Sequence, residues 1–383
     1  KLLFISNIAG KKISNFSIAS IYASKELGYK FHFAANLNKS TLKQIENDEK
    51  KYNIKIHHID IKRNPFNIKN IKAYKQMLDL IEKEKFDVIY CNTPIGGILG
   101  RFCGKKARVP KIIYTAHGFH FYKGAPFINK TVFKWAEMLM AHYTDVIITI
   151  NKEDYQAAQK FRLRKGGKVY YMPGVGVDTK LYQIHGVDKE QLRNSLGIKR
   201  DDIVLIAMGD LIRRKNYSSS IKAIAKANNK KLHFLICGDG PELASLKSLA
   251  KGLGIEEQIH FLGFRTDIKE LLSMADIFLF TTYQEGLPRS MMEAMAAGLP
   301  CVASKIRGNI DLIEDGIGGF LCNPDDIEGF AKAINKLAAD KNLRKSLGFN
   351  NLNTIKQFDV ENVKKIMKMI YKEVLENEKY SEV

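Results

Sequence analysis

Short apolar runs alternate with amphipathic segments from one end of this chain to the other. The runs are rich in Ile, Val, Phe and Tyr, which favour β-strands, and the segments between them carry apolar residues at helical spacing. This alternation is typical of parallel sheets whose strands are joined by crossover helices. The sequence therefore predicts an α/β protein, with strands at residues 2–6, 30–35, 55–59, 87–91, 111–116, 145–150, 168–172, 203–209, 233–238, 259–263, 276–281 and 300–304.

The length of 383 residues exceeds what one ordinary hydrophobic core needs and suits two domains. A stretch punctuated by Gly and Pro, at residues 172–178, separates the first seven expected strands from the last five. We therefore expect two doubly wound domains, at residues 1–172 and 173–360. The final segment, 361–383, is expected to form most of a last helix.

Two carboxylates, Glu285 and Glu293, stand eight residues apart on either side of a break at Pro288. Pro288 suits the first turn of a helix, because its missing N–H costs nothing there, and Gly298 and Pro300 end that helix. Glu285 then lies on a strand-to-helix loop and Glu293 in the first turns of the helix. The free N–H groups and the positive end of the helix dipole between them favour an anion. A diphosphate flanked by sugar hydroxyls, as in a nucleotide sugar, matches this layout.

This string of residues, from Glu285 to Pro300, resembles the retaining glycosyltransferases of family 4, which have the GT-B fold. The resemblance implies two Rossmann-like domains facing a central cleft, an acceptor domain first and a nucleotide-sugar donor domain second. It also implies a C-terminal helix that crosses back to the first domain. By the same resemblance, Glu285 holds the transferred sugar and Glu293 the nucleotide ribose. The donor site then also includes Gly286, Leu287 and Pro288.

The segment Gly209-Asp-Leu-Ile-Arg-Arg-Lys-Asn216 follows an expected strand and resembles the family's Gly-Arg-Leu-x-x-x-Lys. In the family, that Arg and Lys grip the donor diphosphate. Lys215 takes the position of the Lys, whereas Asp210 stands where the family has Arg. Arg213 is our candidate for the missing cation, with Arg214 as the alternative. Cations matter at this point because the departing diphosphate gains charge in the transition state.

Two further loops of the second half resemble parts of the family's nucleotide site. Gly238-Asp-Gly-Pro ends an expected strand and predicts a tight turn close to the nucleotide. A single Gly-x-Gly is weak evidence for dinucleotide binding, since the third glycine of that motif is missing. Phe264 and Arg265 follow the next strand, in the loop that recognises the base in the family. Phe264 fits a core position equally well.

In the first half, Thr115-Ala-His117-Gly-Phe-His120 ends an expected strand, at the edge of the sheet where open α/β folds bind ligands. His117 matches the family histidine that lines the sugar pocket near the reacting carbon, and His120 is a weaker candidate. Gly10, in the first loop, replaces a glycine-rich turn and is expected to approach the acceptor or the phosphate.

No Asp-x-Asp triplet occurs in the sequence. Metal-dependent transferases of the other main fold use such a triplet to hold a divalent cation against the diphosphate. We therefore expect no metal and no cofactor, with the nucleotide sugar as a substrate. The five cysteines form no Cys-x-x-Cys pair and are predicted to be free thiols in a reducing compartment.

The basic residues are concentrated in the first half of the chain. Residues 1–172 contain 31 Lys and Arg against 13 Asp and Glu, a net charge of +18, whereas residues 173–383 have a net charge of +2. A solvated Lys-rich surface is the simplest explanation for many of these residues. The difference between the halves favours a polyanionic partner for the first domain, which we expect to be an anionic membrane surface.

Two stretches of the first half are candidates for contact with that surface. Residues 61–75 interleave basic and apolar side chains, and they suit a bilayer interface or a solvated face equally well. Residues 129–140 carry the only Trp of the chain, and there we expect an ordinary core helix. The chain opens on an expected strand, and no apolar run reaches about 18 residues. We therefore expect neither a signal peptide nor a membrane-spanning helix, and a cytoplasmic protein peripheral to the inner face of the cell membrane.

These features together predict a retaining, metal-independent glycosyltransferase that moves a hexosyl or N-acetylhexosaminyl group. The expected donor is a UDP-sugar, and the expected acceptor is a lipid-linked precursor of a bacterial surface polysaccharide. One alternative is a nucleotide-sugar epimerase of the same architecture. A second is a nucleic-acid-binding protein using the basic half, although no RNP, KH or zinc pattern supports it and we expect no nucleic acid partner. A third, prompted by Asp210, is a scaffold without activity.

Overall fold

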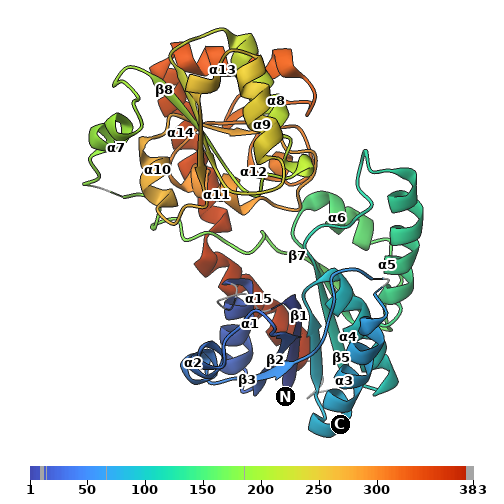
Figure 1. Ribbon diagram of the computed structural model, residues 1–383. Coiled ribbons are helices and arrows are strands. Elements are labelled where there is room, and N and C mark those ends of the chain that lie inside the picture. The colour runs from blue at the N-terminus through green and yellow to red at the C-terminus, as the bar shows by residue number, and fades with distance from the viewer. Residues whose placement is uncertain (9–12, 14, 66, 185, 377–383) are drawn as a thin grey trace. The chain divides into compact units, whose positions relative to one another are not determined.

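The computed structural model describes residues 1–8, 13, 15–65, 67–184 and 186–376. Within them the chain forms two compact units, each an α/β structure built on a parallel sheet (Figure 1). The first unit consists of residues up to Gly176 together with the C-terminal helix from Glu361 onward, and the second runs from Val177 to Val360. The predicted fold class is confirmed, with two Rossmann-like sheets and helices on the faces of each.

The sheet of the first unit has, in the described part of the chain, seven strands in the order β3-β2-β1-β4-β5-β6-β7. All of its neighbouring strands run parallel. The order reverses between β1 and β4, so the carboxyl ends of these two strands form the edge where ligands of such sheets bind. The strands are β1 (Leu2–Ile8), β2 (Phe31–Asn36), β3 (Lys55–His58), β4 (Val88–Cys91), β5 (Lys111–Ala116), β6 (Val146–Thr149) and β7 (Lys168–Tyr171).

The strands of the first unit alternate with helices, as the periodicity predicts. Buried side chains of β1, β4 and β5 form a core with the helices that cover the sheet. The helices are α1 (Asn15–Glu26), α2 (Leu42–Tyr52), α3 (Lys69–Glu84), α4 (Pro94–Lys106), the π-helical turn η1 (Asn129–Phe133), α5 (Lys134–Ala141) and α6 (Lys152–Ala158).

The last helix, α15 (Val360–Glu376), packs in the first unit, far in sequence from its neighbours there. Tyr371 of this helix is fully buried, and its hydroxyl hydrogen-bonds to the hydroxyl of Ser20 on α1. Its ring lies 5.9 Å, between centroids, from that of Tyr90 on β4. The helix predicted to return to the first domain therefore completes the hydrophobic core of that unit.

The sheet of the second unit has six strands, among the described residues, in the order β10-β9-β8-β11-β12-β13. Its strands also run parallel, and its order again reverses next to the first strand, between β8 and β11. The strands are β8 (Ile203–Met208), β9 (Leu232–Cys237), β10 (Ile259–Gly263), β11 (Ile277–Phe280), β12 (Cys301–Ser304) and β13 (Gly319–Cys322).

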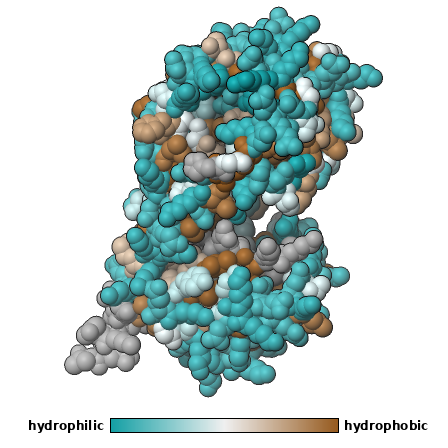
Figure 2. Space-filling model, turned by 90° about the vertical axis from the view of Figure 1, so that its left-hand side faces the viewer, coloured by the Kyte–Doolittle hydropathy of each residue, from teal (hydrophilic) through white to brown (hydrophobic). Residues whose placement is uncertain are grey.

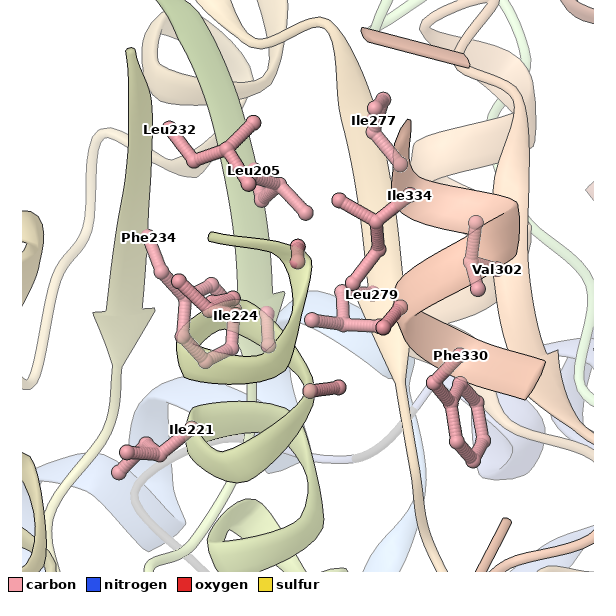
Figure 3. Packing of buried hydrophobic residues seen from close by; sticks show 14 of the residues in the cluster. Leu205, Ile221, Ile224, Leu232, Phe234, Ile277, Leu279, Val302, Phe330 and Ile334 are labelled. Carbon is pink, nitrogen blue, oxygen red and sulfur yellow. The ribbon is translucent and has the colours of Figure 1, made fainter. Parts of the chain in front are cut away.

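Two helices, α8 and α13, pack side by side against the second sheet. Figure 3 shows Ile221 and Ile224 of α8, and Phe330 and Ile334 of α13, beside strand residues such as Leu279. The helices of this unit are α7 (Lys189–Ser195), η2 (Arg213–Lys215), α8 (Tyr217–Ala227), α9 (Leu243–Gly252), η3 (Glu256–Gln258), α10 (Ile268–Met274), α11 (Arg289–Ala296), α12 (Asn309–Leu312), α13 (Ile327–Ala339), α14 (Lys341–Thr354) and η4 (Ile355–Phe358).

The chain enters and leaves the second unit at one place. Val177 pairs with Asp359 in a short parallel bridge, in which Val177 N–H donates to the Phe358 carbonyl and Val360 N–H donates to the Val177 carbonyl. The Thr179 hydroxyl also donates to Asp359 Oδ2 at 2.6 Å. The two ends of the second unit are thus hydrogen-bonded to each other.

Hydrophilic side chains cover most of the surface on the face drawn in Figure 2. None of the helices in the described part of the chain is long and apolar enough to cross a membrane.

The prediction of a core helix at residues 129–140 is wrong, because Val132, Trp135 and Leu139 are exposed there. In the other stretch, 61–75, Ile61 and Ala73 are buried, whereas Ile68 and Ile71 are exposed. Phe66 lies outside the described residues.

Candidate active site

Glu285 lies on the loop between β11 and α11, as predicted. The backbone of Pro288 is extended and caps α11, so the helix begins at Arg289, one residue later than expected from the proline alone. Gly298 follows the helix with φ +76°, a left-handed conformation that suits glycine and ends the helix. Buried Met291 and Met295 fix α11 against the core. Its first N–H groups have no acceptor within the helix and are thus available to an anion.

The side chain of Glu285 is held by three donors. Its Oε1 accepts hydrogen bonds of 2.9 Å each from Lys215 Nζ, Arg214 Nη1 and the Thr282 hydroxyl. Arg214 also donates to the carbonyl of Gln284. The Glu285 side chain is only 11 % exposed and that of Lys215 only 13 %, so this pair lies in a largely desolvated position just before the N-terminus of α11, with the partly exposed Arg214 beside it. Charge-assisted bonds in such surroundings fix geometry well.

Arg214 and Lys215 lie on the turn η2, which follows β8, and hydrogen bonds tie this turn to the loop after β11. Buried Asn216 donates from Nδ2 to the Thr281 carbonyl at 3.0 Å, and the Thr281 hydroxyl donates to the Asn216 carbonyl at 2.7 Å. Tyr283 N–H donates to the Arg214 carbonyl at 2.9 Å. The two loops therefore form one rigid support for the Glu285 cluster.

Two other charged residues between Gly209 and Asn216 lie outside the Glu285 cluster. Arg213, our candidate for the missing cation, is exposed, and it is Arg214 that the structure brings to Glu285. Asp210, which departs from the family pattern, is also exposed. Lys215 is largely buried, with Nζ 4.9 Å from the centroid of the Phe280 ring. The structure thus brings Lys215 and Glu285 together and leaves Arg213 outside their hydrogen bonds.

Gly238 stands where the backbones after β8 and β9 nearly touch. Its φ is +155°, and a Cβ there would lie 2.0 Å from the carbonyl oxygen of Gly209. Its N–H donates to the Gly263 carbonyl at 2.8 Å, which joins three strand ends. The predicted tight turn begins at Gly240, whose carbonyl accepts from the Leu243 N–H at 3.2 Å, and the glycine at position 238 is required by the close approach to Gly209.

The loop after β10 presents Phe264 to solvent. Phe264 is 79 % exposed, so the alternative that it belongs to the core is wrong. Its N–H donates to Asp239 Oδ2 at 3.0 Å, which links this loop to the turn at Gly238. Arg265 pairs with Asp267, and this hydrogen bond lowers the pKa of the Asp267 carboxyl. Arg265 is thereby engaged within its own loop.

Glu293, the second carboxylate, lies one turn into α11. Its Oε1 accepts a hydrogen bond of 2.9 Å from Arg289 Nε, and the hydroxyl of buried Tyr182 hydrogen-bonds to the same side chain. Burial, followed by the nearby Glu293 charge, raises the pKa of Tyr182. The sequence interpretation missed Arg289 and Tyr182. Arg289 is recognisable at i, i+4 from Glu293, whereas Tyr182 has no sequence signal.

Arg307 and Gly308, which the sequence interpretation also missed, contact the backbone of the Glu285 loop. Arg307 is buried and donates from Nε to the carbonyl of Glu285 at 3.1 Å. Gly308 has φ +84°, and a Cβ there would lie 2.5 Å from the carbonyl oxygen of Gly286. The only signal in the sequence is an Arg-Gly pair a few residues after a strand, β12. These contacts fix Gly286 and Leu287 between Glu285 and the helix.

In the first unit, His117 follows β5 and lies beside Asn92, which follows β4. The distance from His117 Nε2 to Asn92 Oδ1 is 2.8 Å. Burial lowers the pKa of His117 to about 4, so its imidazole is neutral at neutral pH. At the neighbouring end of β1, Asn7 Oδ1 accepts from the Thr93 hydroxyl at 2.7 Å. Polar side chains therefore collect at the carboxyl ends of β1, β4 and β5.

Two further candidates of the first unit are His120 and Gly10. His120 is exposed and stacks on Phe133, with 5.0 Å between ring centroids. Gly10 lies outside the described residues. The expected role of His117 beside the transferred sugar stays a prediction.

No group of three or more His, Cys, Asp or Glu side chains in the described segments is arranged to hold a metal ion. The five cysteines are free thiols, as predicted, and four of them are buried. The Arg214–Lys215 pair places two cationic side chains beside Glu285, next to α11.

Known protein families match both units of the chain. The family described as glycosyl transferases group 1 matches residues 188–353, which include Lys215, Glu285 and Glu293. The family described as glycosyl transferase 4-like matches residues 21–151, which include His117. EpsD of Bacillus subtilis, a protein assigned to the glycosyltransferases, is 34 % identical over 91 % of this chain and 90 % of its own. The chain belongs to the family 4 type of glycosyltransferases with the GT-B fold.

One further relative of this glycosyltransferase has a more specific description, and a solved structure shares its fold. The UDP-Gal:alpha-D-GlcNAc-diphosphoundecaprenol alpha-1,3-galactosyltransferase of Escherichia coli is 31 % identical over 78 % of this chain and 79 % of its own. The crystal structure of Anabaena HepE in complex with UDP superimposes with a TM-score of 0.80, at 21 % identity, over 97 % of this chain and 100 % of the other. The second likeness shows the shared fold.

Proposed function

We propose that this glycosyltransferase is a retaining enzyme that transfers a sugar from a UDP-sugar to a lipid-linked precursor of a bacterial surface polysaccharide. The observation that carries the proposal is the contact of Glu285 with Lys215 and Arg214 directly before the N-terminus of α11. Two cations and free helix N–H groups suit a diphosphate, and a carboxylate beside them suits sugar hydroxyls. The description of the Escherichia coli relative, which names UDP-Gal and a diphosphoundecaprenol acceptor, supports the choice of substrates.

In the proposed reaction, Lys215, Arg214 and the start of α11 hold the diphosphate of the donor. The bond between the anomeric carbon and the diphosphate oxygen breaks while the acceptor hydroxyl attacks the same face of the sugar. The leaving diphosphate accepts the proton of that hydroxyl. Cationic groups that are already in position stabilise the charge that develops on the leaving group.

Glu285 positions the sugar in this proposal and forms no covalent bond to it. In the described structure its Oε1 is occupied by the three donors, while its other oxygen is the atom proposed to accept from a sugar hydroxyl. Glu293 is proposed to bind the ribose, because it lies one turn further into α11 than the diphosphate position. The reaction is proposed to need no metal, since cations and backbone N–H groups supply the charge.

A screen of nucleotide sugars by thermal stabilisation tests the donor part of the proposal. A ligand that binds the folded state raises the melting temperature, by an amount that grows with its concentration over Kd. We expect UDP and one or more UDP-sugars to stabilise the protein, and other nucleotides to do so less. Absence of any shift with UDP would contradict the donor assignment.

Product analysis tests the reaction. Incubating the stabilising UDP-sugar with a diphosphate-linked polyprenyl acceptor should release UDP and extend the acceptor, with the anomeric configuration of the donor kept. Inversion would contradict the retaining mechanism. Conversion of the UDP-sugar without acceptor would instead indicate the epimerase alternative.

We further propose that the enzyme works at the cytoplasmic face of the membrane, on an acceptor held by the bilayer. The net charge of +18 in residues 1–172 supports this, because basic side chains are attracted to anionic lipid head groups.

A further inference from the structure

The segment from Phe127 to Leu139 exposes an unusual number of large apolar side chains. It comprises the end of a loop, the turn η1 and most of helix α5, which Figure 1 draws at the outer edge of the first unit. We define its apolar face by six residues with their exposed fractions: Phe127 80 %, Ile128 65 %, Val132 59 %, Trp135 75 %, Met138 39 % and Leu139 53 %. Contiguous apolar surface of this kind marks a site of interaction.

The spacing of these residues gathers them on one side of the helix. Ile128, Val132, Trp135 and Leu139 follow one another at intervals of four, three and four residues, which is the spacing of a single helical face. In an ordinary surface helix that face would pack on the core, whereas here it points to solvent. The apolar side of α5 therefore faces solvent, which is the reverse of the usual arrangement.

A buried ion pair holds the helix in this orientation. Glu137 accepts from Arg101 Nη1 at 3.0 Å and from the Tyr114 hydroxyl at 3.1 Å. Arg101 is fully buried on α4, with its guanidinium 3.9 Å from the centroid of the Tyr114 ring. The polar side of α5 is thus bonded to the interior, and the exposure of the apolar face is fixed by specific contacts.

The exposed charges of the segment itself are of one sign, while Glu153 of α6 accepts a hydrogen bond from the Lys123 N–H at 2.7 Å. Lys123, Lys130 and Lys134 are exposed along the segment, and Glu137 is the only acidic residue between positions 120 and 144. Because Glu137 is paired with Arg101 on the inner side of the helix, the segment has no acidic side chain on its apolar face. The end of α4 continues the pattern, with half-exposed Phe102 against Tyr143 and Lys105 over the Tyr143 ring.

We propose that the apolar face of η1 and α5 docks on an anionic lipid surface. Its aromatic and aliphatic side chains would enter the boundary between head groups and acyl chains, and the three lysines would contact the head groups. Lysine stems suit this position because they lie along apolar surface while the ammonium stays at the polar layer. The inference deepens the proposed function, on which the choice of a membrane rests, by naming the element that touches the membrane.

Charge complementarity selects lipid over the other occupants. Two copies of the chain that met through this face would bring the lysines of both together without a described acidic partner in the segment, which opposes association. A bilayer of anionic lipid supplies the apolar layer and the negative charge in the geometry that the face requires.

The chain offers a direct probe of this docking, because Trp135 is its only tryptophan. The full-length protein is mixed with vesicles of phosphatidylglycerol and phosphatidylcholine, or of phosphatidylcholine alone, and its fluorescence is recorded. We expect a blue shift with the anionic vesicles, quenching by brominated acyl chains, and weaker binding in high salt. No shift with anionic vesicles, or an equal shift with both kinds, overturns the proposal.

Two variants that keep Trp135 test the face itself. The double variant Val132→Ser with Leu139→Ser should weaken vesicle binding about tenfold or more, since two apolar side chains no longer enter the lipid. Lys130→Gln with Lys134→Gln should weaken it about fivefold for each charge, and only for anionic vesicles. Both pairs of residues are exposed, so folding should be preserved.

The matched control is Phe349→Ser, which removes an exposed aromatic residue on α14 of the second unit. It should bind vesicles as the unmodified protein does. Sedimentation without vesicles tests the alternative that a second copy of the chain covers this face. A dimer that dissociates when Val132 and Leu139 are changed would overturn the proposal in favour of contact between copies.

Thermal stabilisation by UDP separates this inference from the proposed function. The helix variants should keep the full shift of melting temperature by UDP. If UDP stabilises the protein and vesicles leave Trp135 unchanged, the docking inference fails alone. If vesicles bind and UDP gives no shift, the donor assignment fails alone.

Discussion

Lys215 Nζ lies 2.9 Å from Glu285 Oε1, so the cation expected to grip the diphosphate already contacts the acid expected to hold the sugar. The two residues come from the loops after β8 and β11, which are neighbours in the sheet although 70 residues separate them. An ammonium group has three donors, so Lys215 can bind phosphate oxygens while it keeps Glu285 in place. The contact therefore orients Glu285 before any sugar arrives.

Replacing Glu285 should separate transfer from nucleotide binding. Glu285→Gln removes the charge that Lys215 and Arg214 share and weakens the hold on a sugar hydroxyl, which is worth about 1.5–3 kcal/mol. We expect sugar transfer to be lost and UDP affinity, measured by calorimetry, to stay within a few fold. A loss of UDP affinity as large as that caused by Glu293→Ala would contradict this division of roles.

The adjacent arginines provide a matched pair. Arg214→Ala should weaken UDP-sugar binding and slow transfer, because Arg214 donates to both the Glu285 side chain and the Gln284 carbonyl. Arg213→Ala should have a smaller effect, since Arg213 is exposed and outside these hydrogen bonds. Titration of both variants with UDP-sugar compares them. An equal or larger loss of UDP-sugar affinity in Arg213→Ala would show that Arg213, and not Arg214, supplies the cation that the family has at the position of Asp210.

Glu293 and Tyr182 should act together on the nucleotide. Glu293→Ala is expected to lower UDP affinity about tenfold or more, because a carboxylate bonded to ribose hydroxyls contributes about 1.5–3 kcal/mol. Tyr182→Phe leaves the carboxylate in place and removes only its buried hydroxyl partner. We expect a smaller loss of affinity from Tyr182→Phe than from Glu293→Ala. Calorimetry with UDP and with uridine measures both.

Removing divalent ions should leave turnover in place. The sequence has no Asp-x-Asp triplet, and the candidate site supplies two cationic side chains and a helix N-terminus instead. Transfer measured in excess EDTA should therefore persist. Complete loss of turnover that magnesium or manganese restores would show that the donor diphosphate needs a metal.

Acid should destabilise the protein partly through His117. Its folded-state pKa of about 4 is below the ordinary value of 6.5, so the unfolded chain binds more protons between these values and stability falls as pH drops from 6.5 to 4. A shift of this size corresponds to at most about 3 kcal/mol. Urea unfolding across that range should show a shallower pH slope for His117→Gln. The control, His120→Gln, changes an exposed residue and should keep the slope.

The sequence predicted the α/β architecture because strands and helices have different apolar periods and alternate without interruption here. It also named Glu285, Lys215 and Glu293 as candidates, because their neighbours in the chain form recognisable strings, and the structure brings Lys215 and Glu285 into contact. It missed Arg307 and Tyr182, and it preferred Arg213 to Arg214, because the contacts of these residues join loops that only the strand order brings together.

The error at residues 129–140 has a definite physical cause. Periodicity identifies the apolar side of a helix and, by default, assigns it to the core. In this chain the ion pair between Arg101 and Glu137 turns the other side inward. The sequence signal for this orientation is weak. It consists of one acidic residue in an apolar helix and one arginine in the glycine-rich helix α4.

The bridge between Val177 and Asp359 makes the second unit an insertion whose two ends meet. The first unit is discontinuous in sequence, since α15 supplies part of its core from the far end of the chain. Lys215, Glu285 and Glu293 all lie within the continuous segment between these ends. Exchange of the second unit between related enzymes by recombination therefore requires two crossover points, one at each end of this segment. Because the two ends are hydrogen-bonded to each other, both junctions lie at one place in the structure.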